Sequence, residues 1–376
     1  MSELKTIYHA EIEVLSPLHI GSGKALQRGF DYTVAGNRTW RINEDALFNA
    51  VYERAQGDRA ALNRLLLGRP AEELLQPDDY RLHPEFFRYA MPGVPRAQGQ
   101  GAELRECMKD VYDRPYIPGS SFKGALRTVL TWAIFRGEKL RFDVRSLGRN
   151  RSWAGQPVER QAMGPDPNHD LLRALQVADS QPVGPEQLML ANVQVVAGDH
   201  TQSPIEVEAL RQGSRLKLTL TLDEYLLGEE IARQLRWGQR GDYLRHIADH
   251  ARSLAQQRIR GELARLEGRP EMARVIQFYR LLDTLRERLQ GSQSFIVQMS
   301  WGGGWGAKTL GSVISDDPRQ FEQVIDDFRL SRSRNRQPGD AFPRSRRIFF
   351  DGRGPALPLG WVMVEVGARA VEGHTG

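Results

Sequence analysis

The sequence predicts an α+β fold built from two similar units, residues 1–176 and 177–376. Residues 6–15 and 216–222 are rich in strand-forming side chains and alternate between apolar and polar ones, as half-buried strands do. Between about 226 and 290 the pattern becomes helical, which places a helical insertion in the second unit. Each half combines strands, helices and a glycine-rich stretch, as expected for two related units.

The first strand leads into a predicted glycine-rich loop. A proline at position 17 ends the hydrogen-bonded ladder, and two glycines and a serine follow it at 21–23. Backbone amides without neighbouring Cβ atoms can approach a phosphate closely, and a lysine and a histidine flank them. The candidate nucleic-acid-binding residues here are His19, Gly21, Ser22, Gly23 and Lys24.

The next segments alternate between regular elements and loops. Residues 31–42 predict a β-hairpin, and Asn43 is placed to cap a helix over about 44–56. Residues 91–101 and 148–170 are rich in glycine and proline, so both are predicted to be loops.

A second candidate phosphate site lies at the start of the following helix. Ser120 or Ser121 is predicted to cap this helix after a proline and a glycine. Free amide groups and the dipole at a helix N-terminus attract anions. Lys123 and Arg127 lie one turn apart on the same face and would add to this attraction. The alternative is an ordinary capped helix packed in the core.

The second unit is predicted to alternate strands and helices and to end in a strand. One short and two long helices are expected over about 226–289, where they would cover the sheet. The strands are predicted at 188–196, 205–210, 216–222, 295–299 and 359–366.

The stretch 301–311 reads Trp-Gly-Gly-Gly-Trp-Gly-Ala-Lys-Thr-Leu-Gly and combines three kinds of nucleic-acid contact. Its glycines expose backbone amides, its tryptophans offer flat faces for base stacking, and its lysine adds a charge. The Walker spacing is absent, because this lysine follows an alanine and not a glycine. The candidates are Trp301, Gly303, Trp305 and Lys308. The alternative is a glycine-rich hairpin whose tryptophans pack in the core.

The charge of the chain favours a polyanionic partner. Its 376 residues carry a formal net charge of +5, and the pI is about 9.4. Such charge runs are often solvated surface, but beside a glycine and tryptophan stretch they favour nucleic acid. The arginines cluster at positions 332, 334, 336, 344, 346 and 347, with a smaller group at 141, 145, 149 and 151. The binding candidates among them are Arg344, Arg346 and Arg347.

Composition also limits the compartment. Cys107 is the single cysteine, which excludes an internal disulfide framework and a zinc site built on several cysteines. The chain contains no uncharged apolar run of 18 residues and begins without an apolar signal segment. The sequence therefore predicts a cytoplasmic protein that does not bind membranes.

The sequence predicts no catalytic residue, no metal site and no cofactor. His246 and His250 have the spacing of zinc ligands, but the glutamate of a zincin motif is missing between them. His19 is the best candidate for a general base acting on a ribose 2′-hydroxyl, with Lys24 stabilising the phosphorane. No second acid or base follows from the sequence, and Asp31 has the pattern of a structural aspartate beside a turn.

Several segments, in this order along the chain, are similar to a known family. Together they resemble the RAMP superfamily of CRISPR effector proteins and, within it, the fifth Csm subunit of type III-A complexes. The matching segments cover nearly the whole chain, apart from the helical middle and the stretch 148–170. They are Leu-Ser-Pro-Leu-His-Ile-Gly-Ser-Gly at 15–23, Tyr-Ile-Pro-Gly-Ser-Ser-Phe-Lys-Gly-Ala-Leu-Arg at 116–127, Glu206-Val207 with Gly213, 302–311, and 342–347 followed by 358–361.

The resemblance implies two ferredoxin-like domains related to RNA-recognition motifs. It implies a non-catalytic RNA-binding subunit at one end of a ribonucleoprotein, capping the 3′ end of the CRISPR RNA and supporting its maturation in antiviral defence. Its partners would be the CRISPR RNA, target RNA in the assembled complex, the backbone and small Csm subunits, and cellular nucleases that trim the 3′ end. In that family a backbone subunit cuts the target with a loop aspartate, and the loop around His19 lacks such an acid.

The sequence leaves two alternatives open. The chain could be a RAMP endoribonuclease that processes CRISPR RNA with His19 as its base, which metal-independent cleavage by the purified protein would reveal. It could also be a related subunit of a type III-B complex, which the partners recovered on purification would decide.

Overall fold

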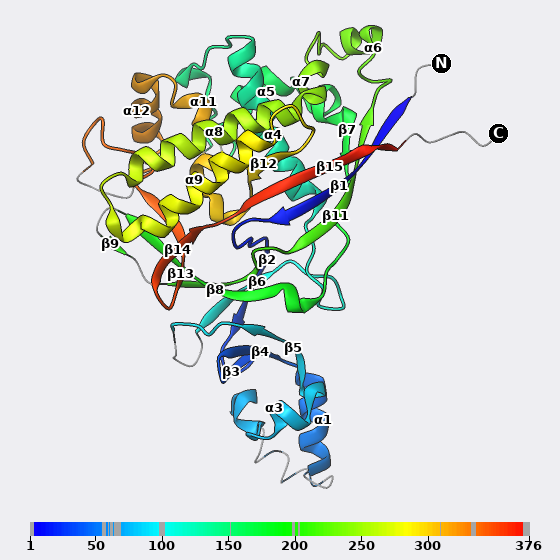
Figure 1. Ribbon diagram of the computed structural model, residues 1–376, viewed down its shortest axis with the longest axis vertical. Coiled ribbons are helices and arrows are strands. Elements are labelled where there is room, and N and C mark those ends of the chain that lie inside the picture. Colours follow the sequence, from blue (N-terminus) through cyan, green and yellow to red (C-terminus); the bar gives the residue numbers. More distant parts are fainter. Residues whose placement is uncertain are drawn as a thin grey trace, which may run out of the picture.

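The computed structural model of the protein has an α+β fold with three sheets (Figure 1). The predicted fold class is therefore confirmed. The structure describes residues 4–54, 58, 60, 63, 69–97, 102–150, 152–197, 200–201, 204–308, 310–331 and 336–370.

The first sheet has five strands in the order β12-β15-β1-β11-β7, and all neighbouring strands in it are antiparallel. β1 (Lys5–Val14) lies between β11 (Arg215–Asp223) and β15 (Trp361–Ala370), while β12 (Phe295–Gln298) and β7 (Leu175–Val177) form the edges. The sheet therefore combines strands from the beginning, middle and end of the chain. The division of the chain into two units stays a prediction.

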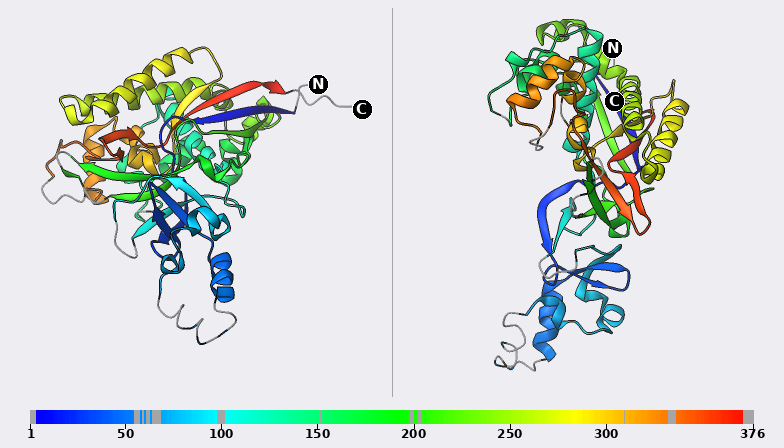
Figure 2. Two further views of the ribbon diagram at one scale, coloured as in Figure 1. Left: turned by 60° about the horizontal axis from the view of Figure 1, so that its bottom comes forward. Right: turned by 90° about the vertical axis from the view of Figure 1, so that its left-hand side faces the viewer.

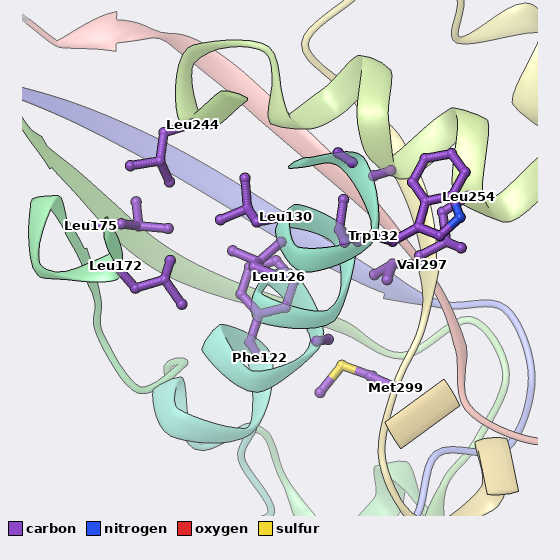
Figure 3. Packing of buried hydrophobic residues seen from close by; sticks show 14 of the residues in the cluster. Phe122, Leu126, Leu130, Trp132, Leu172, Leu175, Leu244, Leu254, Val297 and Met299 are labelled. Carbon is purple, nitrogen blue, oxygen red and sulfur yellow. The ribbon is translucent and has the colours of Figure 1, made fainter. Parts of the chain in front are cut away.

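Helices cover both faces of this sheet. α4 (Gly119–Gly137) and α8 (Ile247–Leu266) pack on one face, where Figure 3 shows Phe122 and Leu126 of α4 in the core. α9 (Ala273–Arg288) packs against the opposite face near β12 and β15.

The segment between β11 and β12 confirms the predicted helical insertion, with two short helices where one was expected. These are α6 (Glu229–Gln234) and α7 (Gly241–Arg245), which precede α8 and α9. In the described part of the chain, no helix is long and apolar enough to cross a bilayer.

The second sheet has six strands in the order β14-β13-β8-β10-β6-β2, and a short seventh strand, β9, pairs with β8. The β10–β6 pair is parallel and the other pairs are antiparallel. The strands are β14 (Gly354–Pro358), β13 (Ser345–Asp351), β8 (Leu188–Ala197), β10 (Ile205–Leu210), β6 (Glu103–Cys107), β2 (Gly21–Gln27) and β9 (His200–Thr201).

A small lobe projects from the rest of the molecule (Figures 1 and 2). Asn43 caps its first helix as predicted, because its side-chain oxygen accepts a hydrogen bond from the amide of Ala46 at 3.4 Å. In its described residues the lobe contains the third sheet and the helices α1 (Glu44–Arg54) and α3 (Asp79–Leu82); the strands of this sheet are β3 (Tyr32–Ala35), β4 (Arg38–Ile42) and β5 (Phe87–Pro92).

Three predicted loops are wrong. Residues 21–23 belong to β2, in which Gly21 pairs with Cys107 of β6 and the register then shifts before Ala25. The stretch 148–170 contains α5 (Gln156–Met163), whose apolar side chains pack in the main core. The stretch 301–311 forms a 3-10 turn followed by α10 (Gly304–Lys308) and the start of α11 (Gly311–Ile314).

Candidate nucleic-acid interface

Trp301 lies on one face of the seven-stranded sheet, over its two central strands. Its half-buried indole packs against a buried cluster formed by Ala191 and Val193 of β8, Val207 and Ala209 of β10, and Leu359. The small side chains of the two strands leave room for a large ring on the sheet. The aromatic side chain is therefore held by the fold and not by a mobile loop.

The structure gathers other predicted residues around this indole. The ring of His19 meets it edge-on, with the two ring centroids 5.7 Å apart. The guanidinium carbon of Arg347 lies 4.2 Å from the ring centroid, and its Nη1 donates a hydrogen bond to the Trp301 carbonyl at 2.8 Å. The predictions from three distant segments thus converge on one place.

Arg105 is a fourth member that sequence reasoning missed. It lies on β6, is exposed, and its guanidinium carbon is 5.1 Å from the indole centroid of Trp301. The alternation of residues 103–107 is that of a short strand and could have placed Arg105 on one face of it. Nothing in the sequence shows that this strand lies next to Trp301.

The two arginines at the indole lack acidic partners. Among the described residues, no carboxylate forms a salt bridge with Arg105 or Arg347, whereas the neighbouring Arg346 forms a bidentate pair with Glu262. Burial and the nearby charge of Arg105 lower the pKa of Arg347. This part of the sheet therefore carries uncompensated positive charge, which attracts anions.

β2 extends this face toward the edge of the sheet. Its residue Ala25 pairs with Arg105, so the exposed Lys24 lies one residue from that pairing. The hydroxyl of Ser22 donates to Glu106 at 2.7 Å and accepts a hydrogen bond from the Lys24 amide at 3.2 Å. Exposed glycines at positions 21 and 23 leave the backbone accessible, as predicted for a phosphate contact.

His19 is buried, which corrects the expectation of an open loop histidine. Its side chain is only 3% exposed, and its Nδ1–H donates to the carbonyl of Glu208 at 2.7 Å. The ring is therefore held in one orientation behind Trp301. A general base must reach the proton that it abstracts, so this position disfavours catalysis by His19.

Glu208 is a buried acid that the sequence did not reveal. Its side chain is fully buried and accepts hydrogen bonds from the Tyr89 hydroxyl at 2.6 Å, from the Cys107 amide at 2.9 Å and from the Lys109 ammonium. The alternation of β10 predicts that its glutamates face solvent, but the small lobe covers this face of the sheet. Burial and the charge of Glu208 raise the pKa of the Cys107 thiol to about 11.

The predicted anion site at the start of α4 is organised differently from the expectation. Neither Ser120 nor Ser121 caps the helix; instead, the Gly119 amide donates to a carboxylate oxygen of Asp179 at 2.7 Å. The serine cap is therefore wrong, because a distant aspartate already occupies this position.

The cations of α4 line a cavity of about 340 Å³ between α4 and α5. Arg127 donates to Asp170 at 2.7 Å and to Glu159 at 3.0 Å, so its charge is compensated within the protein. Lys123 lines the same cavity and has no salt bridge among the described residues, and burial lowers its pKa. Lys123 is thus the better anion-binding candidate of the two.

The other candidates have mostly structural contacts. Trp305 packs against Phe342 and Phe321 with ring centroids 5.4 and 6.0 Å apart, as the core alternative predicted. A Cβ atom at Gly303 would lie 2.5 Å from the Cβ of Ala307, so this glycine is also part of the packing. Arg344 is exposed.

A few positions lie beyond what the structure describes. Lys308 ends α10, but its side chain is not among the described groups, and Arg151, Arg332 and Arg334 lie outside the described residues. Within the described ranges, no cluster of three metal-ligating side chains occurs. His250 stacks on Tyr243 at a ring distance of 5.2 Å.

Comparisons with known proteins agree with this fold. A model of the RAMP superfamily matches residues 11–362. Two Mycobacterium tuberculosis strains have a CRISPR system protein Csm5 that is 23% identical over 285 residues, or 67% of this chain and 74% of theirs.

Two solved structures share the fold along nearly the whole chain. Csm5 of T. onnurineus has a TM-score of 0.65 and 23% identity, covering 94% of this chain and 99% of its own. A chain of a type III-A Csm–crRNA–target RNA ternary complex has a TM-score of 0.69 and 24% identity, covering 95% and 100%. The resemblance predicted from the sequence is confirmed, and the chain belongs to the RAMP superfamily.

Proposed function

We propose that this chain is an RNA-binding subunit of a type III-A CRISPR ribonucleoprotein that holds the 3′ end of the CRISPR RNA and does not cut RNA itself. The observation that carries the proposal is the uncompensated positive face at Trp301, where Arg105 and Arg347 lie without carboxylate partners among the described residues. A polyanion supplies the missing negative charge, and the resulting affinity depends on salt.

The comparisons support the part of this proposal that concerns membership of a type III-A complex. The relatives are Csm5 proteins, and one similar chain comes from a complex with crRNA and target RNA. In this setting the partners are the CRISPR RNA, target RNA in the assembled complex, neighbouring Csm subunits and cellular nucleases that trim the 3′ end. The site of action is the cytoplasm.

Several residues are proposed to contact the RNA backbone. β2, which pairs with β6, offers exposed backbone and the exposed Lys24, and Arg344 adds an exposed charge just before β13. Lys123 is proposed as a separate contact at the cavity beside α4. The buried position of His19 supports binding over cleavage, because it holds the imidazole away from solvent.

Protection of the RNA 3′ end tests this function. The complex is assembled with the wild-type chain, with a Lys24→Gln, Arg105→Gln, Arg344→Gln triple variant, or without the chain, and is treated with a 3′→5′ exonuclease. We expect the wild-type chain to protect several 3′ nucleotides that are lost with the triple variant and in its absence. Identical 3′ ends in all three assemblies would contradict the proposal.

A further inference from the structure

Trp301 has a geometry that differs from that of an open stacking platform. The Arg347 guanidinium lies 4.2 Å from its ring centroid and the Arg105 guanidinium 5.1 Å from it, and the His19 ring makes a T-shaped contact with it at 5.7 Å. The indole also packs down onto the small residues of β8 and β10. Little of the ring is left for a nucleotide base.

The two guanidiniums reach the indole on the same face of the sheet, from strands on either side of it. Arg105 comes from β6 and Arg347 from β13, and these strands are separated by β8 and β10 in the strand order. Cation–π attraction to one shared ring therefore holds two like charges near each other. Their mutual repulsion is uncompensated, since no carboxylate pairs with either of them in the part of the chain that the structure describes.

Among the described residues the buried Arg258 also forms no salt bridge, but three other arginines that are removed from solvent are compensated by acids. Arg127, Arg336 and Arg346 are all partly or largely removed from solvent, and each is bound to at least one carboxylate. Arg347 is half-buried, and its Nε is buried without a hydrogen-bond partner. A buried donor without an acceptor is costly, so this group is satisfied better when a ligand supplies an acceptor oxygen.

We propose that Arg105 and Arg347 clamp one phosphodiester group of the RNA backbone, with Trp301 as the rigid spacer between them and not as a base-stacking platform. The inference rests on the proposed function, because it takes RNA as the ligand. Guanidinium groups match the oxygens of a phosphate, and a clamp on phosphate reads no base. This suits a subunit that must hold guides of any sequence.

The salt dependence of the binding constant reports how many RNA phosphates the protein neutralises. The full-length chain is titrated with a 20-nucleotide single-stranded RNA at several salt concentrations, as wild type, Arg105→Gln, Arg347→Gln and the double variant. If the two arginines clamp one phosphate, the plot of the logarithm of the binding constant against the logarithm of the salt concentration should be less steep by about 0.7 in the double variant. Arg233→Gln on α6 is the matched control for each single variant, because it removes one positive charge from an exposed position far from this face and should leave the slope unchanged. An unchanged slope in the double variant, or a drop of about 1.4 that indicates two separate phosphates, overturns the clamp.

A modified RNA separates phosphate contact from base stacking. A methylphosphonate placed at successive positions should weaken binding about tenfold at one position in the wild type and not in the double variant. Abasic sites should change the affinity less than twofold at every position. A loss of affinity at an abasic site that disappears in Trp301→Leu would show a stacking platform and overturn the proposal.

The outcomes also separate the clamp from the proposed function. If the wild-type chain binds no RNA at all, the proposed function itself fails. If it binds RNA and the double variant binds equally well, only the clamp is refuted.

Discussion

Gly302 lies where the glycine-rich stretch meets the segment before β15. A Cβ atom added there would lie 2.2 Å from the Cβ of Leu359, whereas at Gly306 no atom lies within 4 Å. We expect Gly302→Ala to lower the free energy of unfolding by about 1–3 kcal/mol through overpacking. Gly306→Ala should leave it unchanged or raise it by about 0.4–1 kcal/mol. Urea denaturation measures both, and equal effects would contradict this assignment of the two glycines.

Glu208 of β10 and Lys109, two residues after β6, form a buried ion pair under the small lobe, whose Tyr89 also bonds Glu208. Removing one member of such a pair costs about 3–5 kcal/mol, because the other charge stays buried. We expect Glu208→Gln to fall at the lower end of this range, since Glu106 lies 3.7 Å from the Lys109 ammonium and keeps part of the attraction. Denaturant unfolding of the purified variant gives the value.

The double variant Glu208→Gln, Lys109→Met is the control for this pair. It removes both charges, so it should be more stable than Glu208→Gln alone. A double variant that loses as much stability as the sum of the two single changes would show that the pairing of charges is unimportant here.

At the scale of elements, a surface ion pair ties α9 to β13. Arg274 donates to Asp351 at 2.9 Å, and this bond lowers the pKa of Asp351 to about 2. In the unfolded chain this carboxyl has a pKa of about 3.9 and takes up its proton first as the pH falls, so the stabilisation is complete only above about pH 5 and is lost as the pH falls toward 2. Asp351→Asn should therefore be less stable than the wild type by under about 1 kcal/mol at pH 7, since the pair is partly exposed. Denaturation at pH 7 and pH 3 should show the difference shrinking, and a difference independent of pH would contradict the assignment.

The elements that the sequence predicted well are those with a clear period. β1, β11, the hairpin of the small lobe and the long helices follow from alternation and capping, which are local properties. The glycine-rich stretches were misread because their structure depends on distant partners. β6 pairs with Gly21 and with Ala25 and so draws this stretch into a strand, and Leu359 packs closely on the turn at Gly302.

The candidate site shows the same limit. The sequence identified His19, Trp301 and Arg347 one by one, from glycine content, aromatic residues and charge. It could not identify Arg105, because only the strand order places β6 near Trp301. It also could not show that Arg346 pairs with an acid while Arg347 does not, since that difference depends on the position of Glu262 on α8.

At the scale of the whole molecule, the seven-stranded sheet separates two environments. Leu190 and Glu208 face the small lobe, whereas Ala191 and Val207 face Trp301 on the other side. The acids of β10 are therefore buried under the lobe and do not reach the face that carries the unpaired arginines. This separation keeps the proposed RNA face positive in a chain whose net charge is only +5.

The fate of CRISPR RNA incubated with the purified protein decides between binding and cleavage. Labelled RNA is mixed with the protein with and without divalent metal, and both retention and chain length are followed. We expect RNA that is bound in a salt-dependent manner and keeps its full length under both conditions. Absence of binding, or a specific shortening that His19→Ala abolishes, would contradict the proposal of a non-catalytic RNA-binding subunit.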